Sequence, residues 1–482
     1  MPSSLSHLDR PLASSAAALE GAVRGAHRRR LARLGWDHVW QPGPWPWVAG
    51  DPQPRSGNAV DVLIDGEEAF AALVEEISRA RSHVHLTAWR LTLSFLLTRE
   101  GPPVTLLDLL AGVANRVEVR VMIWQGAPLP VVRPWRADAL LACRRLRQAG
   151  VRCVLDRTDR LTGTAHDKVV VVDDRVAFVN GIDPTELPVD RFDSRDHPPR
   201  GGMGWHDLGV RLRGPIVEDV AAHFGRRWET ATGEELTSPQ RSEPEGGVRA
   251  QLVDTVPEGR YSGLPRGSFR VLDAYLDALR RARRLIYVET EFLWSSEVVA
   301  LLADRLRRPP CEEFRVVLVL PLSPLAGFDR TRGQLAILDE ADGAAGRLLA
   351  CTVHAHGTAG SFPIYVHSKV CIVDDDWMTV GSANLNDNSL FRATEANIVV
   401  ADNELVRQTR ERLWSEHLEL PASEVTADPL RTLEDLWRPL AEEGSERRRR
   451  GESPRARLSF LPHASGGFGR LVGSVQNLLL GT

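Results

Sequence analysis

The sequence contains almost no lysine. It has 482 residues and 60 basic side chains, and every one of these except Lys168 and Lys369 is an arginine. Cysteine is also scarce, with five residues at long spacings and no C-x-x-C pair. An odd number at such spacings argues against a disulfide framework or a zinc cage. We therefore interpret the cysteines as small buried apolar residues of a protein in a reducing compartment.

An excess of one charge and long apolar runs are missing as well. The net charge of −4 gives no overall field that would attract nucleic acid. No stretch approaches the roughly 20 apolar residues that span a bilayer. Charged residues interrupt the apolar runs of the first 30 residues, unlike in a signal peptide. With 43% hydrophobic residues, we expect a soluble globular protein in the cytoplasm, and leave membrane association open.

From about residue 58 the apolar spacing alternates between helix and strand. Residues 67–82 show helical spacing, whereas residues 117–124 alternate as a strand does. The β-branched run 169–172 predicts a strand that is buried on both faces. Alternating strands and helices predict an α/β layer architecture.

The same order of elements then recurs. Residues 73–91 align without gaps with residues 275–293, and the segment from His166 aligns with that from His367. This indicates duplication of a whole α/β lobe, with a linker at about 230–247. We predict an N-terminal extension, two lobes and an arginine-rich C-terminal tail, with the boundaries 1–55, 56–235, 248–425 and 426–482.

The two ends allow alternatives. Residues 42–47 hold three prolines, which exclude a helix, and Trp40, Trp45 and Trp47 either pack on the main body or lie at a membrane interface. The arginine run 447–450 and the apolar segment 471–480 are either a solvated linker with a small helix or a contact with anionic lipid. We favour packing for the first and solvation for the second.

Both lysines belong to one motif, H-x-K-x(4)-D. Its copies are His166, Lys168 and Asp173, and His367, Lys369 and Asp374. Side chains at i and i+2 of a strand share a face, so each imidazole lies beside its ammonium. Such a pair suits a phosphodiester, because the ammonium offsets anionic oxygens while the imidazole attacks phosphorus or moves a proton.

The segments that follow the motifs carry a resemblance. After the second motif comes 381–384, GSAN, and the matching segment 180–183 reads NGID. The chain thereby resembles the phospholipase D superfamily, whose doubled signature is H-x-K-x(4)-D-x(6)-G-S-x-N. The second copy matches fully, and Asp183 in the first resembles the lipid-acting branches. The stretches 205–207 (WHD) and 414–418 (WSEHL) add to the likeness, whereas 287–293 (YVETEFL) departs from the more usual E-N-Q-Y-F at Thr290 and Glu291.

The resemblance implies two α/β/α lobes about a pseudo-twofold axis, with the active site at their interface. There His166 would attack phosphorus to give a phosphohistidine, and His367 would act as general acid and base. No metal or other cofactor is implied. Phosphate contacts would come from the lysines and from Asp183, Ser382 and Asn384.

Further candidate residues accompany these histidines. Asp207 and Glu395 are candidates to orient the imidazoles through their second nitrogen. Asp173 and Asp374 begin turns, so they either cap structure or touch substrate. The pairs His83/His85 and His354/His356 have a spacing that zinc could use, but packing or groove roles are favoured because no Cys or Glu ligand stands nearby.

Three functions compete. The first is a phosphodiesterase or phosphatidyltransferase acting on phospholipid, with a peripheral membrane contact left open and a monomer expected. The second is a nucleic-acid phosphodiesterase, against which the negative net charge argues. The third is a lipid-binding or protein-binding scaffold without activity, against which both intact His-Lys pairs argue.

Overall fold

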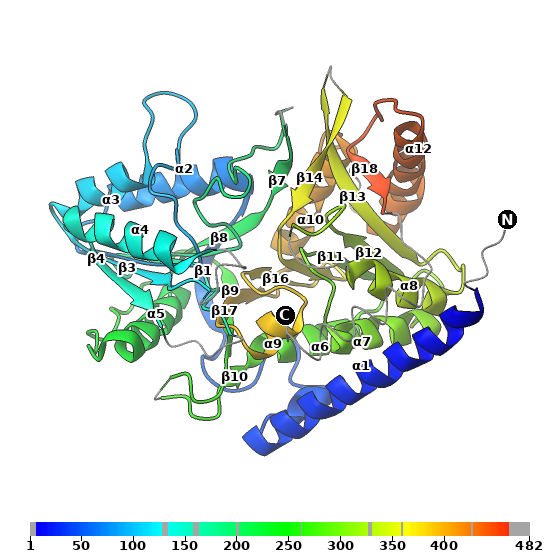
Figure 1. The fold of residues 1–482 in the computed structure, drawn as a ribbon, viewed down its shortest axis with the longest axis horizontal. Helices are drawn as coiled ribbons and strands as arrows, with labels where there is room; N and C mark the ends of the chain where they lie inside the picture. Colours follow the sequence, from blue (N-terminus) through cyan, green and yellow to red (C-terminus); the bar gives the residue numbers. More distant parts are fainter. Residues whose placement is uncertain are drawn as a thin grey trace.

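The computed structural model describes residues 6–127, 134–157, 163–198, 202–261, 263–325, 330–357, 360–425 and 428–461. Its strands form two mixed sheets that lie side by side, each with its own helices (Figure 1). The predicted α/β class is confirmed.

Seven strands of the first sheet pair in the order β4-β3-β2-β5-β6-β8-β1. The neighbours β2, β3 and β4 are parallel, and the remaining pairs are antiparallel. The strands are β1 (Arg55–Ile64), β2 (His83–Ala88), β3 (Glu118–Trp124), β4 (Arg152–Asp156), β5 (Val169–Val172), β6 (Val176–Asn180) and β8 (Leu208–Arg213).

The second sheet repeats this order as β13-β12-β11-β15-β16-β17-β9, with the same three parallel neighbours. Pairing of β1 with β9 joins the sheets. The repeated order is the arrangement that a duplicated lobe would give; the pseudo-twofold axis stays a prediction. The strands are β9 (Val248–Val256), β11 (Leu285–Glu289), β12 (Arg315–Val319), β13 (Leu348–Gly357), β15 (Val370–Val373), β16 (Trp377–Gly381) and β17 (Glu395–Val400), with the short β10 (Ser268–Phe269) beside β9.

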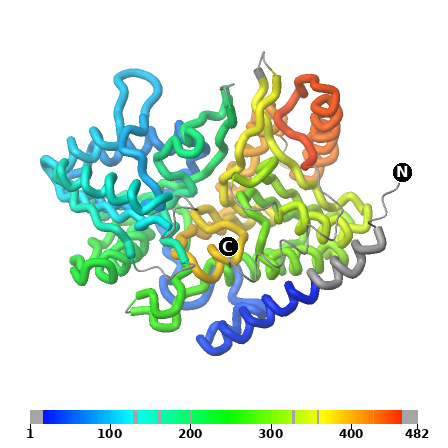
Figure 2. The backbone as a smooth tube through the Cα atoms, viewed as in Figure 1, coloured from blue at the N-terminus to red at the C-terminus, as the bar shows by residue number. Residues whose placement is uncertain are grey.

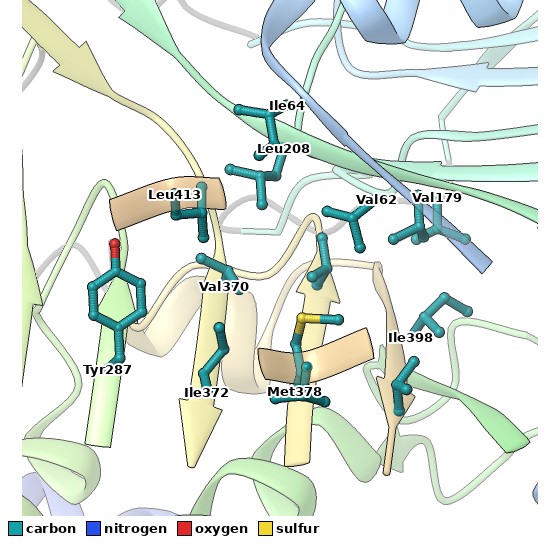
Figure 3. Close-up of a cluster of buried hydrophobic side chains, with 14 of the residues drawn as sticks. Val62, Ile64, Val179, Leu208, Tyr287, Val370, Ile372, Met378, Ile398 and Leu413 are labelled. Carbon is teal, nitrogen blue, oxygen red and sulfur yellow. The ribbon is translucent and has the colours of Figure 1, made fainter. Parts of the chain in front are cut away.

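Helices cover both sheets because the strands are apolar on two faces. In β5, Val170 and Val172 pack with the helices on the outer face of the first sheet. Val169 and Val171 face a core that both sheets share. Figure 3 shows this shared core, with Val62, Ile64, Val179 and Leu208 from the first sheet and Val370, Ile372, Met378 and Ile398 from the second. Apolar packing in this shared core therefore holds the two sheets together.

The helices between β1 and α10 fall mainly into three groups. The outer face of the first sheet carries α2 (Asp65–Ser78), α3 (Leu106–Ala114) and α4 (Arg136–Gln148). The outer face of the second carries α6 (Arg270–Arg281), α7 (Ser296–Arg307) and α8 (Arg330–Asp342). The shared core includes residues of α5 (Ile216–Thr232) and α10 (Asn403–Leu418), and the short α9 (Asp387–Phe391) follows β16. None of the described helices combines the length and apolar character needed to cross a bilayer.

The N-terminal segment packs on the second sheet's helices. Helix α1 (Ser6–Leu34) and the 3-10 helix η1 (Asp37–Trp40) lie along α6 and α7 (Figure 2). The His27 ring stacks on Phe391 at 3.9 Å, and its Nδ1 lies 2.6 Å from Glu297. Trp36, Trp40 and Trp47 also pack against this core, and Trp45 stacks on Trp377. The geometry favours packing over a membrane interface for these tryptophans.

The C-terminal segment 428–461 is part of the second sheet's structure. Strand β18 (Leu458–Phe460) pairs with the outer edge of β13, and Trp437 is fully buried. The predicted boundary at 425 therefore falls inside packed structure. Arg447 pairs with Glu443 and Arg448 donates to Ser459, whereas the apolar segment 471–480 lies outside the described residues. The remaining elements are α11 (Pro429–Thr432), the π-helix η2 (Leu433–Trp437) and α12 (Arg438–Arg449).

The five cysteines are free thiols, and all but Cys311 are buried. They pack as apolar side chains, as their sequence context predicts.

Candidate active site

Backbone hydrogen bonds between the two sheets' connections position both motifs. The amides of His166 and Asp167 donate to the Thr394 carbonyl at 2.9 and 2.8 Å. The amides of His367 and Ser368 donate in the same way to the His206 carbonyl. These hydrogen bonds to His206 continue the parallel pairing of β14 (Gly360–Val366) with β7 (Gly204–His206). His166 is thus held beside Thr394, which precedes Glu395. In the same way, His367 is held beside His206, which precedes Asp207.

Each histidine consequently pairs with a carboxylate from the other half of the chain. Glu395 lies 3.0 and 3.1 Å from Nδ1 of His166, and Asp207 lies 2.5 Å from Nδ1 of His367. Both carboxylates are fully buried, whereas the side chain of His166 is 12% exposed and that of His367 5% exposed. The sequence proposed both carboxylates as orienting residues, and the structure assigns each to the histidine of the other motif.

Electrostatics favours a neutral imidazole at His367. Burial and the charge of Lys369 lower the pKa of His367 to about 4, against the opposing influence of Asp207 and Glu291. Burial alone would raise the pKa of Asp207, but His367 and Lys369 hold it below its usual range. The Asp207 carboxylate is therefore charged, and it keeps the proton of His367 on Nδ1 with Nε2 free to accept.

The two lysines lie close enough to influence each other. Burial lowers the pKa of Lys369 to about 8, and Lys168 and Arg191 contribute to the decrease. Each ammonium donates to the carbonyl of the histidine two residues before it, Lys168 at 2.7 Å. Both H-x-K motifs thus bring their ammonium groups to one site.

The three predicted phosphate contacts occupy different positions. Asp183 is buried 3.7 Å from Lys168 Nζ and 3.3 Å from Arg191, so it neutralises and orients these cations. The Ser382 hydroxyl donates to Glu395 at 2.6 Å and thereby fixes that carboxylate. Only Asn384, whose amide donates to Glu291 at 3.3 Å, directs a donor into the pocket.

The aspartates that end the motifs lie at the far ends of β5 and β15. Asp173 accepts the backbone amides of Arg81, Ser82 and His83, and Asp374 accepts those of residues 283–285. Both have positive φ, at 55° and 54°. This geometry favours the capping alternative over contact with substrate.

The structure adds Glu291, Tyr365 and Arg191 to the site, none of which the sequence predicted as a site residue. Glu291 lies 3.5 Å from Nε2 of His367, and Tyr365 donates to it at 2.8 Å. Trp205 stacks on Tyr365 and lies against His367, with centroid distances of 5.1 and 4.8 Å. The Arg191 guanidinium lies over Trp205. The departure at Glu291 from the more usual glutamine was the available sequence signal.

The middle residue of each motif reaches into a buried polar network. Asp167 binds His223 at 3.1 Å and Arg227 at 2.7 Å. Ser368 donates to Glu289 at 2.6 Å, and Glu289 also binds His206 and His417. These networks tie the segments that hold His166 and His367 to α5 and α10, since His223 and His417 lie on those helices.

Three groups in the described part of the chain place metal-binding atoms close together. All are buried, and they are Asp65, His197, His206 and Glu416; His206, Glu289 and His417; and His27, Glu297 and Asp387. Each mixes imidazoles with carboxylates, so the charges compensate one another. Although burial opposes it, Glu289 and the other carboxylates raise the pKa of His206 well above its usual value, as expected for an ion-paired imidazolium.

The two histidine pairs whose spacing zinc could use do not belong to these three groups. His83 and His85 stack on each other, with His85 against Phe224. His354 and His356 lie on β13, where His356 pairs with Glu419 at 3.2 Å.

Comparison with known proteins agrees with the predicted family. A family model described as "Cardiolipin synthase, PLD-like domain" matches residues 275–416. Phospholipase D2 of Bos taurus is 26% identical over 481 residues, covering 73% of this chain and 50% of the relative. Phospholipase D alpha 1 of Cynara cardunculus is 25% identical over 515 residues, covering 72% and 63%. The chain thus spans half to under two thirds of the length of these relatives.

A solved structure has a similar fold. The crystal structure of phosphatidylserine synthase from Haemophilus influenzae matches with a TM-score of 0.51 at 13% identity, covering 78% of this chain and 92% of that one. At this identity the likeness concerns the fold alone. The doubled motif, the family-model match over residues 275–416 and the curated relatives together support the phospholipase D superfamily as the family of this chain.

Proposed function

We propose that the protein is a phosphodiesterase acting on phospholipid head groups, by hydrolysis or phosphatidyl transfer, through a covalent phosphohistidine. The observation that carries the proposal is that each H-x-K histidine has a buried carboxylate on Nδ1, Glu395 for His166 and Asp207 for His367. A carboxylate in this position fixes the tautomer and leaves Nε2 as nucleophile or base. The relatives named phospholipase D support phospholipid as the substrate class.

In the proposed reaction, His166 Nε2 attacks phosphorus and forms a P–N bond. The bond from phosphorus to the head-group oxygen breaks, and that oxygen takes a proton from His367. Water or an acceptor alcohol then gives a proton to His367 and attacks phosphorus, which breaks the P–N bond and frees His166. Lys168, Lys369 and Asn384 donate to the non-bridging oxygens, where negative charge gathers.

The acid role of His367 requires uptake of a proton. The ligand-free protein favours neutral His367, because burial and Lys369 lower its pKa to about 4. A bound phosphate anion near Nε2 would stabilise the imidazolium and raise this pKa. Proton uptake is therefore expected to accompany substrate binding.

A substrate panel tests the function. It presents phosphatidylcholine, phosphatidylethanolamine, phosphatidylglycerol and single-stranded DNA, each with and without a primary alcohol. We expect phosphatidic acid from at least one lipid, and the phosphatidyl alcohol when alcohol is present. Lipid turnover that survives in His166→Ala or His367→Ala would contradict the two-histidine mechanism. DNA cleavage without lipid turnover would replace the proposed substrate class.

A substrate with a good leaving group distinguishes the two histidines. The p-nitrophenolate of phosphatidyl-p-nitrophenol leaves without a proton, so the first step no longer needs the general acid. We expect His367→Ala to release a burst of p-nitrophenol and to accumulate the adduct on His166, detected by mass spectrometry at alkaline pH. His166→Ala should give no burst. The opposite pattern would exchange the two roles.

A further inference from the structure

The pocket formed by the two motifs already contains a carboxylate of the protein itself. Oε2 of Glu291 lies 3.5 Å from His367 Nε2, 4.0 Å from Lys369 Nζ and 3.3 Å from the amide nitrogen of Asn384. His367, Lys369 and Asn384 are the groups that the proposed function assigns to the phosphate and its leaving oxygen. Lys369 and Asn384 can donate to a carboxylate oxygen and to a phosphate oxygen alike, so the two oxygens cannot occupy this position together.

Glu291 holds a negative charge there. Burial alone would raise the pKa of Glu291, but His367, Lys369 and the hydrogen bond from Tyr365 keep it below its usual value. The side chain is only 13% exposed, so solvent screens this charge weakly. An incoming phosphate therefore meets electrostatic repulsion as well as an occupied position.

The two oxygens of Glu291 have different partners. Oε1 accepts the Tyr365 hydroxyl at 2.8 Å, and that hydroxyl accepts the Leu325 amide at 3.2 Å. Tyr365 is fixed in turn by stacking on the buried Trp205. Oε2 alone contacts the pocket donors, so it can be released while Oε1 keeps its partner.

We propose that Glu291 determines specificity by occupying the phosphate pocket of the free protein, so that a substrate phosphate binds only by displacing Oε2. The displaced carboxylate stays beside the pocket on Tyr365 and repels further negative charge. A phosphodiester, with one charge, is then accepted more readily than a phosphomonoester or another dianion. The same repulsion favours release of the phosphomonoester product that hydrolysis of a phosphodiester leaves.

Anion binding tests this inference without any turnover. Calorimetry measures the Kd of the dianion sulfate and of the monoanion dimethyl phosphate in the full chain and in Glu291→Gln, which has the amide more usual in the family. We expect the Kd of sulfate to fall at least tenfold in Glu291→Gln, and that of dimethyl phosphate to fall by a smaller factor. Glu312→Gln removes an exposed carboxylate and should change neither value.

Glu291→Ala provides a second variant if the glutamine variant does not fold, and the same tightening is expected. A Kd within twofold of the parent value in the folded variants would overturn the inference. Absence of sulfate binding in the parent and in every variant would overturn it too, because the position would then not be an anion site. The inference rests on the proposed function only for the position of the phosphate. Lipid turnover without this change in anion affinity would refute the role of Glu291 and leave the proposed function intact.

Discussion

The carboxylate of Glu395 contacts Nδ1 of His166 although the two residues are 229 positions apart. His367 and Asp207 form the reciprocal contact over 160 positions. The crossing arises because the residue before each carboxylate, Thr394 or His206, accepts the backbone amide of the opposite histidine. Each acid–base pair of the site therefore depends on both lobes.

Removing either carboxylate charge should reduce catalysis rather than binding. We expect Glu395→Gln and Asp207→Asn to lower kcat by about 10³-fold or more, because the imidazole loses its preferred tautomer. KM should change little, since the lysines stay in place. Steady-state kinetics on the preferred lipid measures both constants, with the exposed Glu442→Gln as control. A kcat within threefold of the parent would contradict the orienting role.

Asp173 should matter for stability and not for kcat. It accepts three backbone amides at 2.7–3.0 Å, so Asp173→Ala leaves them without this partner. We expect the free energy of unfolding to fall by about 2 kcal/mol. Asp173→Asn keeps an acceptor and tolerates the φ of 55°, so its loss should be smaller. Urea unfolding measures the free energy of unfolding. A large fall in kcat with unchanged stability would favour contact of Asp173 with substrate instead.

The pH dependence should show a basic limb from Lys369. Because burial lowers its pKa from 10.5 to about 8, Lys369 loses its proton as the pH rises through about 8. We expect kcat/KM, which reports the free enzyme, to fall above this pH. Between about 8 and 10.5 the unfolded chain binds more protons at this residue, so its contribution to stability rises with pH.

A pH–rate profile from 6 to 10 measures this limb. Lys369→Arg keeps the charge over the whole range, so its residual activity should lack the limb. A profile of the parent protein that stays flat to pH 10 would show that the Lys369 ammonium is not required.

Trp437 tests whether the C-terminal segment belongs to the second lobe. It is fully buried, packs on Trp414 with centroids 5.1 Å apart, and donates to Cys351. Trp437→Ala should lower the free energy of unfolding by about 3–5 kcal/mol, since it leaves a cavity in the shared core. The exposed Leu140→Ala serves as control, with a change within about 0.5 kcal/mol. An equally small change for Trp437→Ala would show that residues beyond 425 are dispensable.

The local part of the site could be predicted from the sequence. The order of each motif predicted a His-Lys pair at the start of a buried strand, but residues 166–168 and 367–369 lie just before β5 and β15, so strand periodicity does not extend to the two pairs. The run 169–172 predicted β5, and the repeated order of elements in the sequence recurs as the repeated strand order of the two sheets.

The long-range part could not be predicted in this way. Ser382 looks like a phosphate donor in the motif, yet it donates to Glu395 because β16 and β17 are hydrogen-bonded neighbours. The contact of Glu291 with His367 likewise depends on the pairing of β11 with β15. Strand pairing between distant segments decides these contacts, and apolar periodicity does not report it.

The reciprocal pairing of His166 with Glu395 and of His367 with Asp207 makes the connection at 233–247 a natural place to divide the polypeptide. Either fragment alone would retain an imidazole and an ammonium but lose the carboxylate that fixes the imidazole. Co-expressed fragments would regain both only by docking through the shared apolar core and the β1–β9 ladder. Recovery of activity by fragment complementation would thus report correct docking of the two pieces.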